Sequence, residues 1–248
     1  MRIATGVEML EISATIMGKS SVIHPTLLWD DETAVLVDAG YPGQQGLLRE
    51  AMAQAGVPFA RLRYVILTHQ DLDHLGSLPA LLQEAPQQVD VLASAAARPY
   101  IQGELPSLRF TPEVIERVMA SLPAEYTEER RQAFRTALEH PPTAQVDLIL
   151  TDGEVMPCCG GITVIATPGH IPGHLCLYHQ PSKTLIAGDA LTVVDGQLQT
   201  SPFDMEHEEA FRSLAKLAQY DIATVICYHG GLYAGDINQR IAALAHGG

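Results

Sequence analysis

The chain has 248 residues, in which 29 acidic residues outnumber 15 lysines and arginines and give a formal net charge of −14. With 47% hydrophobic and 18% charged residues it has the composition of a globular protein, which excludes intrinsic disorder, and its length suffices for a large core. The acidic excess disfavours nucleic acids and anionic membrane surfaces, because both are recognised through lysine and arginine.

The first part of the chain has the pattern of several strands and two helices. Asp30 and Asp31 predict a hairpin turn between two strands, and Gly56 predicts the end of a helix because glycine tolerates the left-handed conformation found there. The predicted elements are strands over 8–16, 21–29 and 33–37, a helix over 47–55, a strand over 63–67, a loop over 69–76, the start of a helix over 78–82 and a strand over 89–93.

The segment 106–142 differs from its surroundings and predicts a helical insertion. Thr111 followed by Pro112 has the pattern of a helix N-terminus. Thr127 is followed by the acidic residues Glu128 and Glu129, which favours a second N-terminus. We therefore expect two helices here, inserted between segments of a sheet.

The last part of the chain returns to strands and ends in two helices. We expect Asp204 to cap a helix over 205–219, and Asp236 with Gln239 to form a capping box on the final helix. The predicted strands cover 146–150, 161–166, 175–179, 184–187 and 223–227. Because each half of the chain has its strands before its helices, we expect an α/β fold in one domain over 1–248, with two central sheets and helices outside as four layers.

Cysteine usage and the N-terminus bear on the compartment. The segment 1–17 carries Glu8 and Glu11 in its apolar stretch and lacks a basic start, so we expect no signal peptide. No apolar run approaches the ~20 residues of a membrane span. The four cysteines are too few for a disulfide scaffold, and adjacent Cys158 and Cys159 lack zinc-site spacing, so we expect reduced, mostly buried thiols. A soluble, cytoplasmic protein is expected.

Four of the predicted strands end in groups of polar residues that are common metal ligands. Such strand ends hold a site rigidly when they converge on one edge of the fold. The groups are Thr68–His74 (THQDLDH), Thr167–His170 (TPGH), Gly188–Asp189 and Tyr228–Gly231 (YHGG).

The first of these groups is dense enough to indicate two metal ions. It places four ligand-type side chains within six positions, which cannot all face one ion but can divide between two neighbouring ions. The other strand ends supply further ligands, and two such cations would lower the pKa of a bound water and polarise a carbonyl or phosphoryl oxygen. Alone, His229 would indicate a buried structural histidine, and a turn residue after Gly188 is the alternative for Asp189; the set as a whole favours metal. The candidate ligands are His69, Asp71, Asp73, His74, His170, Asp189 and His229.

This set resembles the metallo-β-lactamase-fold hydrolase superfamily, whose hallmark is His-x-His-x-Asp-His followed by a later His, a bridging Asp and a last His. The resemblance runs from Val22 to His229 in the right order and implies an αβ/βα sandwich with two mixed sheets. It also implies that Asp38, in Leu-Val-Asp-Ala-Gly, supports the metal loop without binding metal. The implied ligands are His69, Asp71 and His170 for site one, Asp73, His74 and His229 for site two, and Asp189 as the bridge.

The sequence departs from the family at Asp71, where the second histidine of the hallmark is usual. A carboxylate there makes the inner shell neutral when two divalent ions and a hydroxide are bound, and a harder, more neutral site favours Mn or Fe relative to Zn. In the alternative, Asp71 points away and site one is weak or empty. The cofactors expected are two divalent metal ions, either Zn or, because of Asp71, Mn or Fe.

Several branches of the superfamily differ from this chain in one feature each. True β-lactamases of this fold lack the bridging aspartate, and nuclease branches carry basic surfaces or an extra domain. Glyoxalase II-like thioesterases have a C-terminal helical domain, for which the 19 residues after His229 are too few. Flavodiiron proteins have a carboxylate at the position of Asp71, which supports iron, but also a flavodoxin domain that we do not find here.

Quorum-quenching lactonases are more similar to this chain. They share Thr-Pro-Gly-His-x-Pro-Gly-His, here Thr167–His174, and a helical insertion, but usually place a tyrosine where this chain has Thr192, a shorter hydroxyl. His174 is a candidate for holding a ligand in place. The apolar residues of the insertion either cover a pocket or only pack the insertion onto the body: Leu108, Phe110, Val114, Met119, Leu122, Tyr126 and Phe134.

The resemblance implies a dinuclear metal-dependent hydrolase, of lactonase or esterase type, that attacks an ester, lactone or thioester carbonyl with a metal-bound hydroxide. Asp189 would bridge the ions, and Asp73 or a water at site two would protonate the leaving group, so these two carboxylates are the catalytic ones. The expected partner is a small-molecule substrate, without nucleic acid or membrane; a homodimer is one possible assembly. An iron-dependent persulfide dioxygenase, a phosphoester hydrolase and a non-catalytic metal-binding protein are the alternatives.

Overall fold

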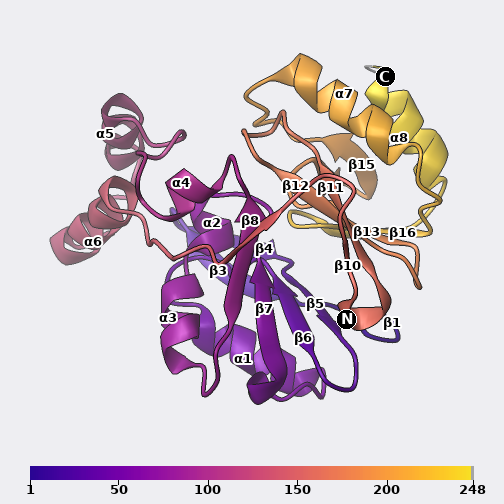
Figure 1. Cartoon of the computed structure of the whole chain (residues 1–248). Coiled ribbons are helices and arrows are strands. Elements are labelled where there is room, and N and C mark those ends of the chain that lie inside the picture. Colours follow the sequence, from indigo (N-terminus) through magenta and orange to yellow (C-terminus); the bar gives the residue numbers. More distant parts are fainter. Residues whose placement is uncertain (247–248) are drawn as a thin grey trace.

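A computed structural model describes residues 1–246 of the chain, in which two β-sheets lie face to face between two layers of helices (Figure 1). The first sheet has the strand order β1-β2-β5-β6-β7-β8-β9. Strands β6 to β9 run parallel to one another and the other neighbouring strands pair antiparallel, so the sheet is mixed. Its strands are β1 Arg2–Ala4, β2 Val7–Met9, β5 Thr26–Trp29, β6 Ala34–Val37, β7 Leu62–Ile66, β8 Asp90–Ser94 and β9 Leu148–Leu150.

The second sheet has the order β10-β11-β12-β13-β16-β17 and is also mixed, because only β13 and β16 pair in parallel. Two hairpins, β3–β4 and β14–β15, stand outside both sheets. The remaining strands are β3 Ile12–Ile16, β4 Lys19–Ile23, β10 Val155–Met156, β11 Ile162–Ala166, β12 Leu175–His179, β13 Thr184–Ile186, β14 Leu191–Val194, β15 Gln197–Thr200, β16 Thr224–Cys227 and β17 Gly231–Tyr233.

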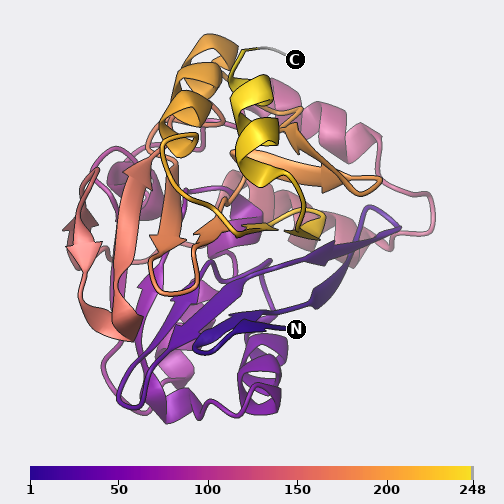
Figure 2. The same cartoon turned by 90° about the vertical axis from the view of Figure 1, so that its right-hand side faces the viewer.

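Helices cover the outer face of each sheet. Helices α1 and α3 pack on the first sheet and α7 and α8 on the second, so the layers run helix, sheet, sheet, helix (Figures 1 and 2). This confirms the predicted α/β four-layer αβ/βα sandwich with two mixed central sheets. The helices are α1 Gln45–Gln54, α2 Leu72–Leu75, α3 Leu78–Glu84, α4 Arg98–Ile101, α5 Pro112–Ala120, α6 Glu128–Glu139, α7 His207–Leu217 and α8 Ile237–Ala245, with short 3-10 turns η1 Phe59–Arg61 and η2 Cys158–Gly160.

Strand β6 shows why the central strands are apolar throughout. Its four residues are all buried: Ala34 and Leu36 face the helices α1 and α3, whereas Val35 and Val37 face the second sheet. A strand with helices on one side and a sheet on the other has no solvent face, so it has no polar alternation. The two sheets pack on each other through apolar side chains. The C-terminal ends of β7, β11, β13 and β16 lie at one edge of the sandwich, and the segments that follow them carry the candidate site.

Two long predicted strands are each divided in the structure. The segment 8–16 breaks between β2 and β3, and 21–29 breaks between β4 and β5 at Pro25, which has no backbone N–H to give to a ladder. The outer halves pair with each other as the β3–β4 hairpin. The strands β1, β10, β14, β15 and β17 were not predicted from the sequence.

The predicted caps are confirmed in the insertion and wrong in the C-terminal part. The side chains of Thr111 and Thr127 accept hydrogen bonds from backbone N–H groups at the starts of α5 and α6. Asp204 does not cap α7, which begins after Glu206, because its carboxylate faces His170 instead. Asp236 precedes α8 but makes no side-chain capping bond, so the capping box is absent there.

Helices α5 and α6 occupy the segment predicted as a helical insertion and stand to one side of the sandwich (Figure 1). All four cysteines are free; Cys158 is half-buried and the other three are buried, as predicted. Within residues 1–246, no helix has both the length and the apolar character needed to cross a membrane.

Candidate metal centre

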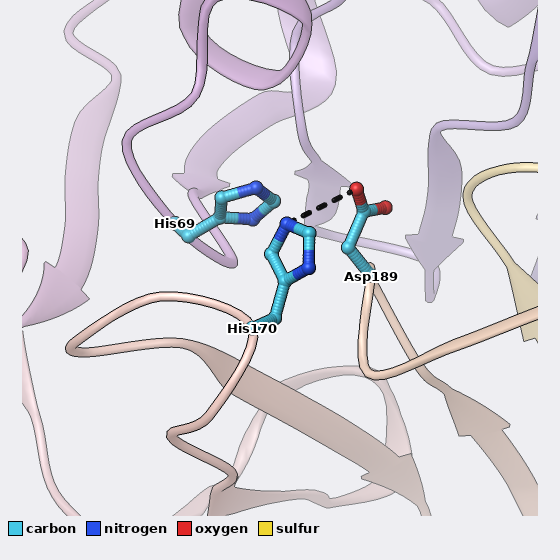
Figure 3. A group of neighbouring side chains, drawn as sticks. All are labelled: His69, His170 and Asp189. Atoms are coloured by element: carbon cyan, nitrogen blue, oxygen red, sulfur yellow. Dashed lines mark ion pairs between the residues drawn. The ribbon is translucent and has the colours of Figure 1, made fainter. Parts of the chain in front are cut away.

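All seven candidate ligands come together at one edge of the sandwich, each from a segment that directly follows a strand. The loop after β7 and the short helix α2 carry four of them, and the ends of β11, β13 and β16 each carry one. Their ligand atoms form two groups in which all atoms lie within 4.8 Å of one another: one has His69, His170 and Asp189 (Figure 3), the other Asp73, His74 and His229.

Asp71 faces the first of these groups, although it is not among its three members. Its Oδ2 lies 3.4 Å from Nε2 of His69 and 3.7 Å from Nε2 of His170. The carboxylate of Asp189 completes this side, with Oδ2 3.5 Å from Nε2 of His170. The sequence left open whether Asp71 faces site one or points away from it; in the structure its side chain faces site one.

Asp189 also faces the second group, so its carboxylate lies between the two sites. Its Oδ1 is 3.5 Å from Nε2 of His74, and its Oδ2 is 3.4 Å from Nε2 of His229. Asp73 closes this side with Oδ2 3.1 Å from Nε2 of His229 and 3.7 Å from Nε2 of His74. A carboxylate that reaches both groups is in the position required of a bridge between two ions.

Three of the atoms that face the centre have no hydrogen-bond partner, and a bound cation would supply one. Nε2 of His69, Nε2 of His74 and Oδ1 of Asp189 are buried and make no hydrogen bond. Buried polar atoms normally have partners. Imidazole nitrogens and carboxylate oxygens are ligands of Zn²⁺, Mn²⁺ and Fe²⁺, so the residues fit a pair of divalent ions.

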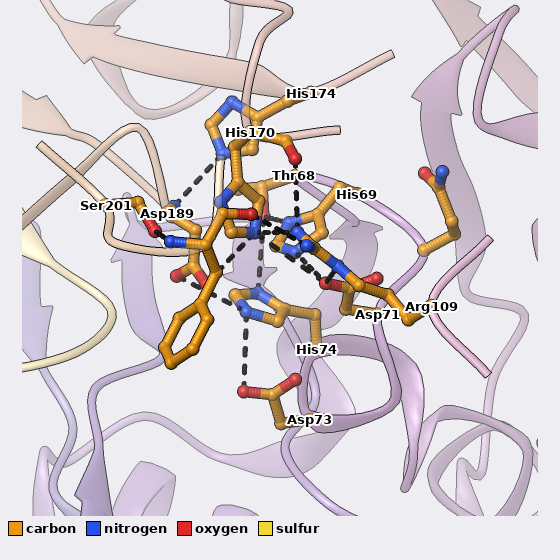
Figure 4. A network of polar contacts seen from close by, with 12 residues as sticks. Thr68, His69, Asp71, Asp73, His74, Arg109, His170, His174, Asp189 and Ser201 are labelled. Carbon is orange, nitrogen blue, oxygen red and sulfur yellow. Dashed lines mark hydrogen bonds and ion pairs between the residues drawn. The ribbon is translucent and has the colours of Figure 1, made fainter. Parts of the chain in front are cut away.

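A buried network fixes the two histidines of the first loop. Asp38, with φ of 65°, accepts a hydrogen bond from the backbone N–H of Thr68 at 2.9 Å and lies 2.9 Å from Nδ1 of His74 through Oδ2. The hydroxyl of Thr68 lies 3.0 Å from Nδ1 of His69 (Figure 4). A carboxylate on the far nitrogen of an imidazole fixes its tautomer and leaves Nε2 free for metal. Asp38 therefore supports the metal loop, as the resemblance implied.

His174 holds Asp189 through its backbone and is not placed as a ligand. The fully buried ring accepts the N–H of Asp189 on Nε2 at 3.0 Å, and its Nδ1 lies 2.8 Å from the hydroxyl of Thr167. Burial, with the neighbouring His69 and His170, lowers the pKa of His174 well below its usual value. A neutral ring is what these two hydrogen bonds require.

Negative charge accumulates in the centre because one buried carboxylate, Asp189, and two half-buried ones, Asp71 and Asp73, lie close together. Burial opposes their charge, but the surrounding histidines hold the pKa values of Asp71 and Asp189 well below the usual range. Conversely, burial disfavours the charged form of His229, but Asp189 and Asp73 raise its pKa to about 10. Without metal, protons on histidine supply part of the positive charge that the carboxylates demand, and divalent ions would replace them.

Three residues at the centre were not identified from the sequence. The guanidinium of Arg109, from the loop before α5, lies 2.9 Å from Oδ2 of Asp71 (Figure 4). Asp204 places Oδ1 3.4 Å from Nδ1 of His170, and the ring of Tyr228 lies against that of His74 with centroids 3.9 Å apart. A motif search could not find Arg109 or Asp204, because each lies outside the four segments that carry the ligand motifs.

The hydroxyl of Thr192 does not point at a substrate position. Its Oγ1 donates to the backbone carbonyl of His229 at 3.0 Å. It therefore fixes the end of β16 and does not stand in for the lactonase tyrosine.

A cavity of about 470 Å³ opens over the centre, and an apolar cavity of about 450 Å³ adjoins it. The two share Tyr41, Leu72, Asp73 and Phe110 in their walls. Val114, with Phe110, lines the first cavity from the insertion, and Phe134 lines the second. Two other apolar residues of the insertion, Leu122 and Tyr126, are buried but line neither cavity, so their role is packing.

Comparison with known proteins agrees with this geometry. A family model described as the metallo-beta-lactamase superfamily matches residues 21–229. Two proteins of Bacillus subtilis (strain 168) are each 29% identical to this chain. "Probable metallo-hydrolase YflN" matches over 210 residues, which cover 79% of this chain and 75% of that protein. "Uncharacterized protein YobT" matches over 214 residues, which cover 82% of this chain and 81% of that protein.

Solved structures share the fold. The metallo-beta-lactamase family protein TTHA1429 from Thermus thermophilus superposes with a TM-score of 0.68 at 25% identity, covering 99% of this chain and 80% of that one. A metallo-beta-lactamase from Pontibacter korlensis gives a TM-score of 0.69 at 16% identity and covers 100% of this chain and 98% of that one. At 16% identity, the similarity to the Pontibacter korlensis structure supports the fold alone.

Proposed function

The chain belongs to the metallo-β-lactamase superfamily of metallo-hydrolases, and we propose that it is a dinuclear enzyme that hydrolyses an ester, lactone or thioester with an apolar chain. The observation that carries the proposal is the pairing of two ligand groups around Asp189, beneath a cavity that adjoins a second, apolar one. The first feature supports metal-dependent hydrolysis, and the second supports the class of substrate.

The residues divide into two ligand sets. His69, Asp71 and His170 would hold one ion, and Asp73, His74 and His229 the other, with Asp189 between them. Ions bound there would lower the pKa of a water toward neutrality and polarise a carbonyl oxygen.

The chain's own groups perform the remaining tasks. Asp38 and Asp204 face the far ring nitrogens of His74 and His170, and His174 holds the backbone of Asp189. The side chain of Asp73 is 19% exposed and lines both cavities, so it reaches the space where a leaving group would stand. It is the group that would pass a proton to the departing alkoxide or thiolate.

The walls of the adjoining cavity favour an apolar substituent. Ile16 and Met17 approach from the β3–β4 turn, and Val118, Phe134 and Leu138 approach from the insertion. An acyl or alkyl chain in this cavity would leave its carbonyl beside the metal centre, since both cavities share Asp73 and Phe110.

The test is an activity screen on protein purified without chelator, with its metal content measured. The substrates are acetyl and octanoyl aryl esters, short and long acyl lactones, thioesters and aryl phosphoesters. We expect the octanoyl carbonyl substrates to be preferred and Asp189→Asn to lose activity. An Asp189→Asn variant that keeps both metals and full esterase activity would overturn the bridging role.

Other outcomes of the same screen distinguish other chemistry. Phosphoester hydrolysis alone would contradict the carbonyl substrate while keeping the metal centre. Oxygen consumption on adding glutathione persulfide to iron-loaded protein, with no hydrolysis, would favour persulfide oxidation, for which a carboxylate at Asp71 is compatible with iron.

A further inference from the structure

Arg109 lies in the centre as an additional cation that the ligand motif does not contain. It stands in the loop between α4 and α5, and its side chain is only 21% exposed. Nε donates to Oδ2 of Asp71 at 2.9 Å, and Nη2 lies 2.7 Å from Nε2 of His170 (Figure 4). Nη1 donates to the backbone carbonyl of Phe203 at 2.7 Å, and Nη2 also reaches the carbonyl of His170 at 3.1 Å.

These contacts involve the same atoms that a metal ion at site one would use. Nε2 of an imidazole has a single lone pair, so His170 cannot accept a hydrogen bond from Arg109 and bind an ion through Nε2 at once. The carboxylate oxygen of Asp71 that faces His69 and His170 is also the one that accepts from Arg109. A guanidinium is always charged and has a fixed fork of donors, which suits it to this place.

Site two does not share this arrangement. Among residues 1–246, the side-chain hydrogen bonds of Arg109 are with Asp71, His170 and Phe203, and none is with Asp73, His74 or His229. Two neighbouring sites with similar ligands therefore differ in one respect: site one already has a cation supplied by the protein.

We propose that Arg109 and a divalent ion are alternative occupants of site one, so that site two binds its ion first and site one binds only when the insertion withdraws Arg109. The inference rests on the proposed metal centre. It assigns the insertion a control over metal loading, because the backbone that carries Arg109 leads directly into α5. The same movement shifts Phe110, which lines both cavities.

An anion-binding role is the other use of an arginine in an active site, and the geometry disfavours it. The guanidinium directs Nε and both terminal nitrogens to Asp71, His170 and Phe203. Few of its N–H groups remain for a carboxylate or phosphate of a substrate. A metal ion bound to Asp71 and His170 would break these two hydrogen bonds and release the guanidinium.

The experiment is a titration of the chelator-stripped full chain with Mn²⁺ and, separately, Zn²⁺, followed by calorimetry and by competition with a chromophoric chelator. The variants are Arg109→Ala and Arg109→Met, the second keeping most of the side-chain volume. Arg117→Ala is the matched control, because Arg117 is exposed on α5 of the same insertion. Circular dichroism and thermal unfolding identify any variant that does not fold.

The proposal predicts one tight and one weaker equivalent in the wild type and in Arg117→Ala. Removing the guanidinium in Arg109→Ala or Arg109→Met should tighten the second equivalent about tenfold or more and leave the first unchanged. Unchanged or weaker second binding in the folded variants would overturn it. If the wild type binds two metal ions equally tightly, Arg109 does not compete for site one, but the metal centre stands. If none of the proteins binds metal, the proposed metal centre is contradicted as well.

Discussion

At the scale of single residues, the centre depends on groups that never face a metal. Asp38 illustrates this, because it is 1% exposed and connects the backbone of Thr68 to the ring of His74. Its early position in the chain and its family motif made it predictable. The places of Arg109 and Asp204 in the centre were not predictable, because no local pattern points to them and both residues reach the centre through long-range contacts.

We predict that Asp38→Asn weakens metal binding at site two by about 10–100-fold, because the amide cannot hold Nδ1 of His74 as a carboxylate does. Metal affinity is measured by competition with a chelator on the folded variant. Asp30→Asn is the control, since Asp30 also bonds several backbone N–H groups but far from the centre. Equal affinities for Asp38→Asn and wild type would refute the orienting role.

At the scale of elements, strands buried on both faces and helices with clear caps were predictable. Strand β6 is apolar throughout, and Thr111 and Thr127 begin their helices as expected. The short strands β10 and β17 were missed because two or three residues carry no periodic signal. Their pairing is set by the neighbouring strands. The cap assigned to Asp204 failed because a tertiary contact with His170 replaced a local hydrogen bond.

The turn after β16 makes a close backbone approach that only glycine allows. Gly230 has φ of +89°, and a Cβ there would lie 2.0 Å from the carbonyl oxygen of Val193. We predict that Gly230→Ala lowers the free energy of unfolding by about 3 kcal/mol or more and weakens site two, because it displaces the adjacent His229.

The matched control is Gly196→Ala, which has φ of +74° with nothing within 4 Å of the added Cβ. Gly196→Ala should lower the free energy of unfolding by about 1 kcal/mol, because only the left-handed backbone conformation opposes the added Cβ. Urea unfolding and metal titration compare the two variants. If Gly230→Ala costs no more than Gly196→Ala, the close approach does not shape the site.

The insertion is predicted to select the substrate through Phe134, which lines the apolar cavity from α6. Phe134→Ala should lower kcat/KM for an octanoyl ester by about tenfold, because it removes apolar surface that the chain would contact. Its kcat/KM for the acetyl ester should change little. Gln132→Ala, on the exposed side of the same helix, serves as the control. A parallel loss for both esters would place the acyl chain elsewhere.

At the scale of the whole molecule, the centre connects the two sheets. Four candidate ligands follow β7 in the first sheet, and His170, Asp189 and His229 follow strands of the second. Ions bound here would therefore stabilise the pairing of the two halves in addition to their catalytic role. The layer order was predictable from the sequence, because strands precede helices in each half of the chain.

Metal removal should accordingly lower the thermal stability of the protein. An ion present at 100 times its Kd contributes about 2.7 kcal/mol when it binds only the folded state. For a chain of this size, that corresponds to a decrease in Tm of roughly 5–10 °C on adding chelator. Differential scanning calorimetry checks this, and Tm should recover when Mn²⁺ or Zn²⁺ is restored. A Tm that is indifferent to chelator would show that the ions do not hold the halves together.

The most direct test of the account is the rate of octanoyl ester hydrolysis measured as metal is returned to the chelator-stripped chain, with bound metal counted in each sample. The account predicts that hydrolysis is absent without metal, rises as ions bind and reaches its maximum when both sites are filled. Full hydrolysis by protein that holds far less than one ion per chain would contradict it.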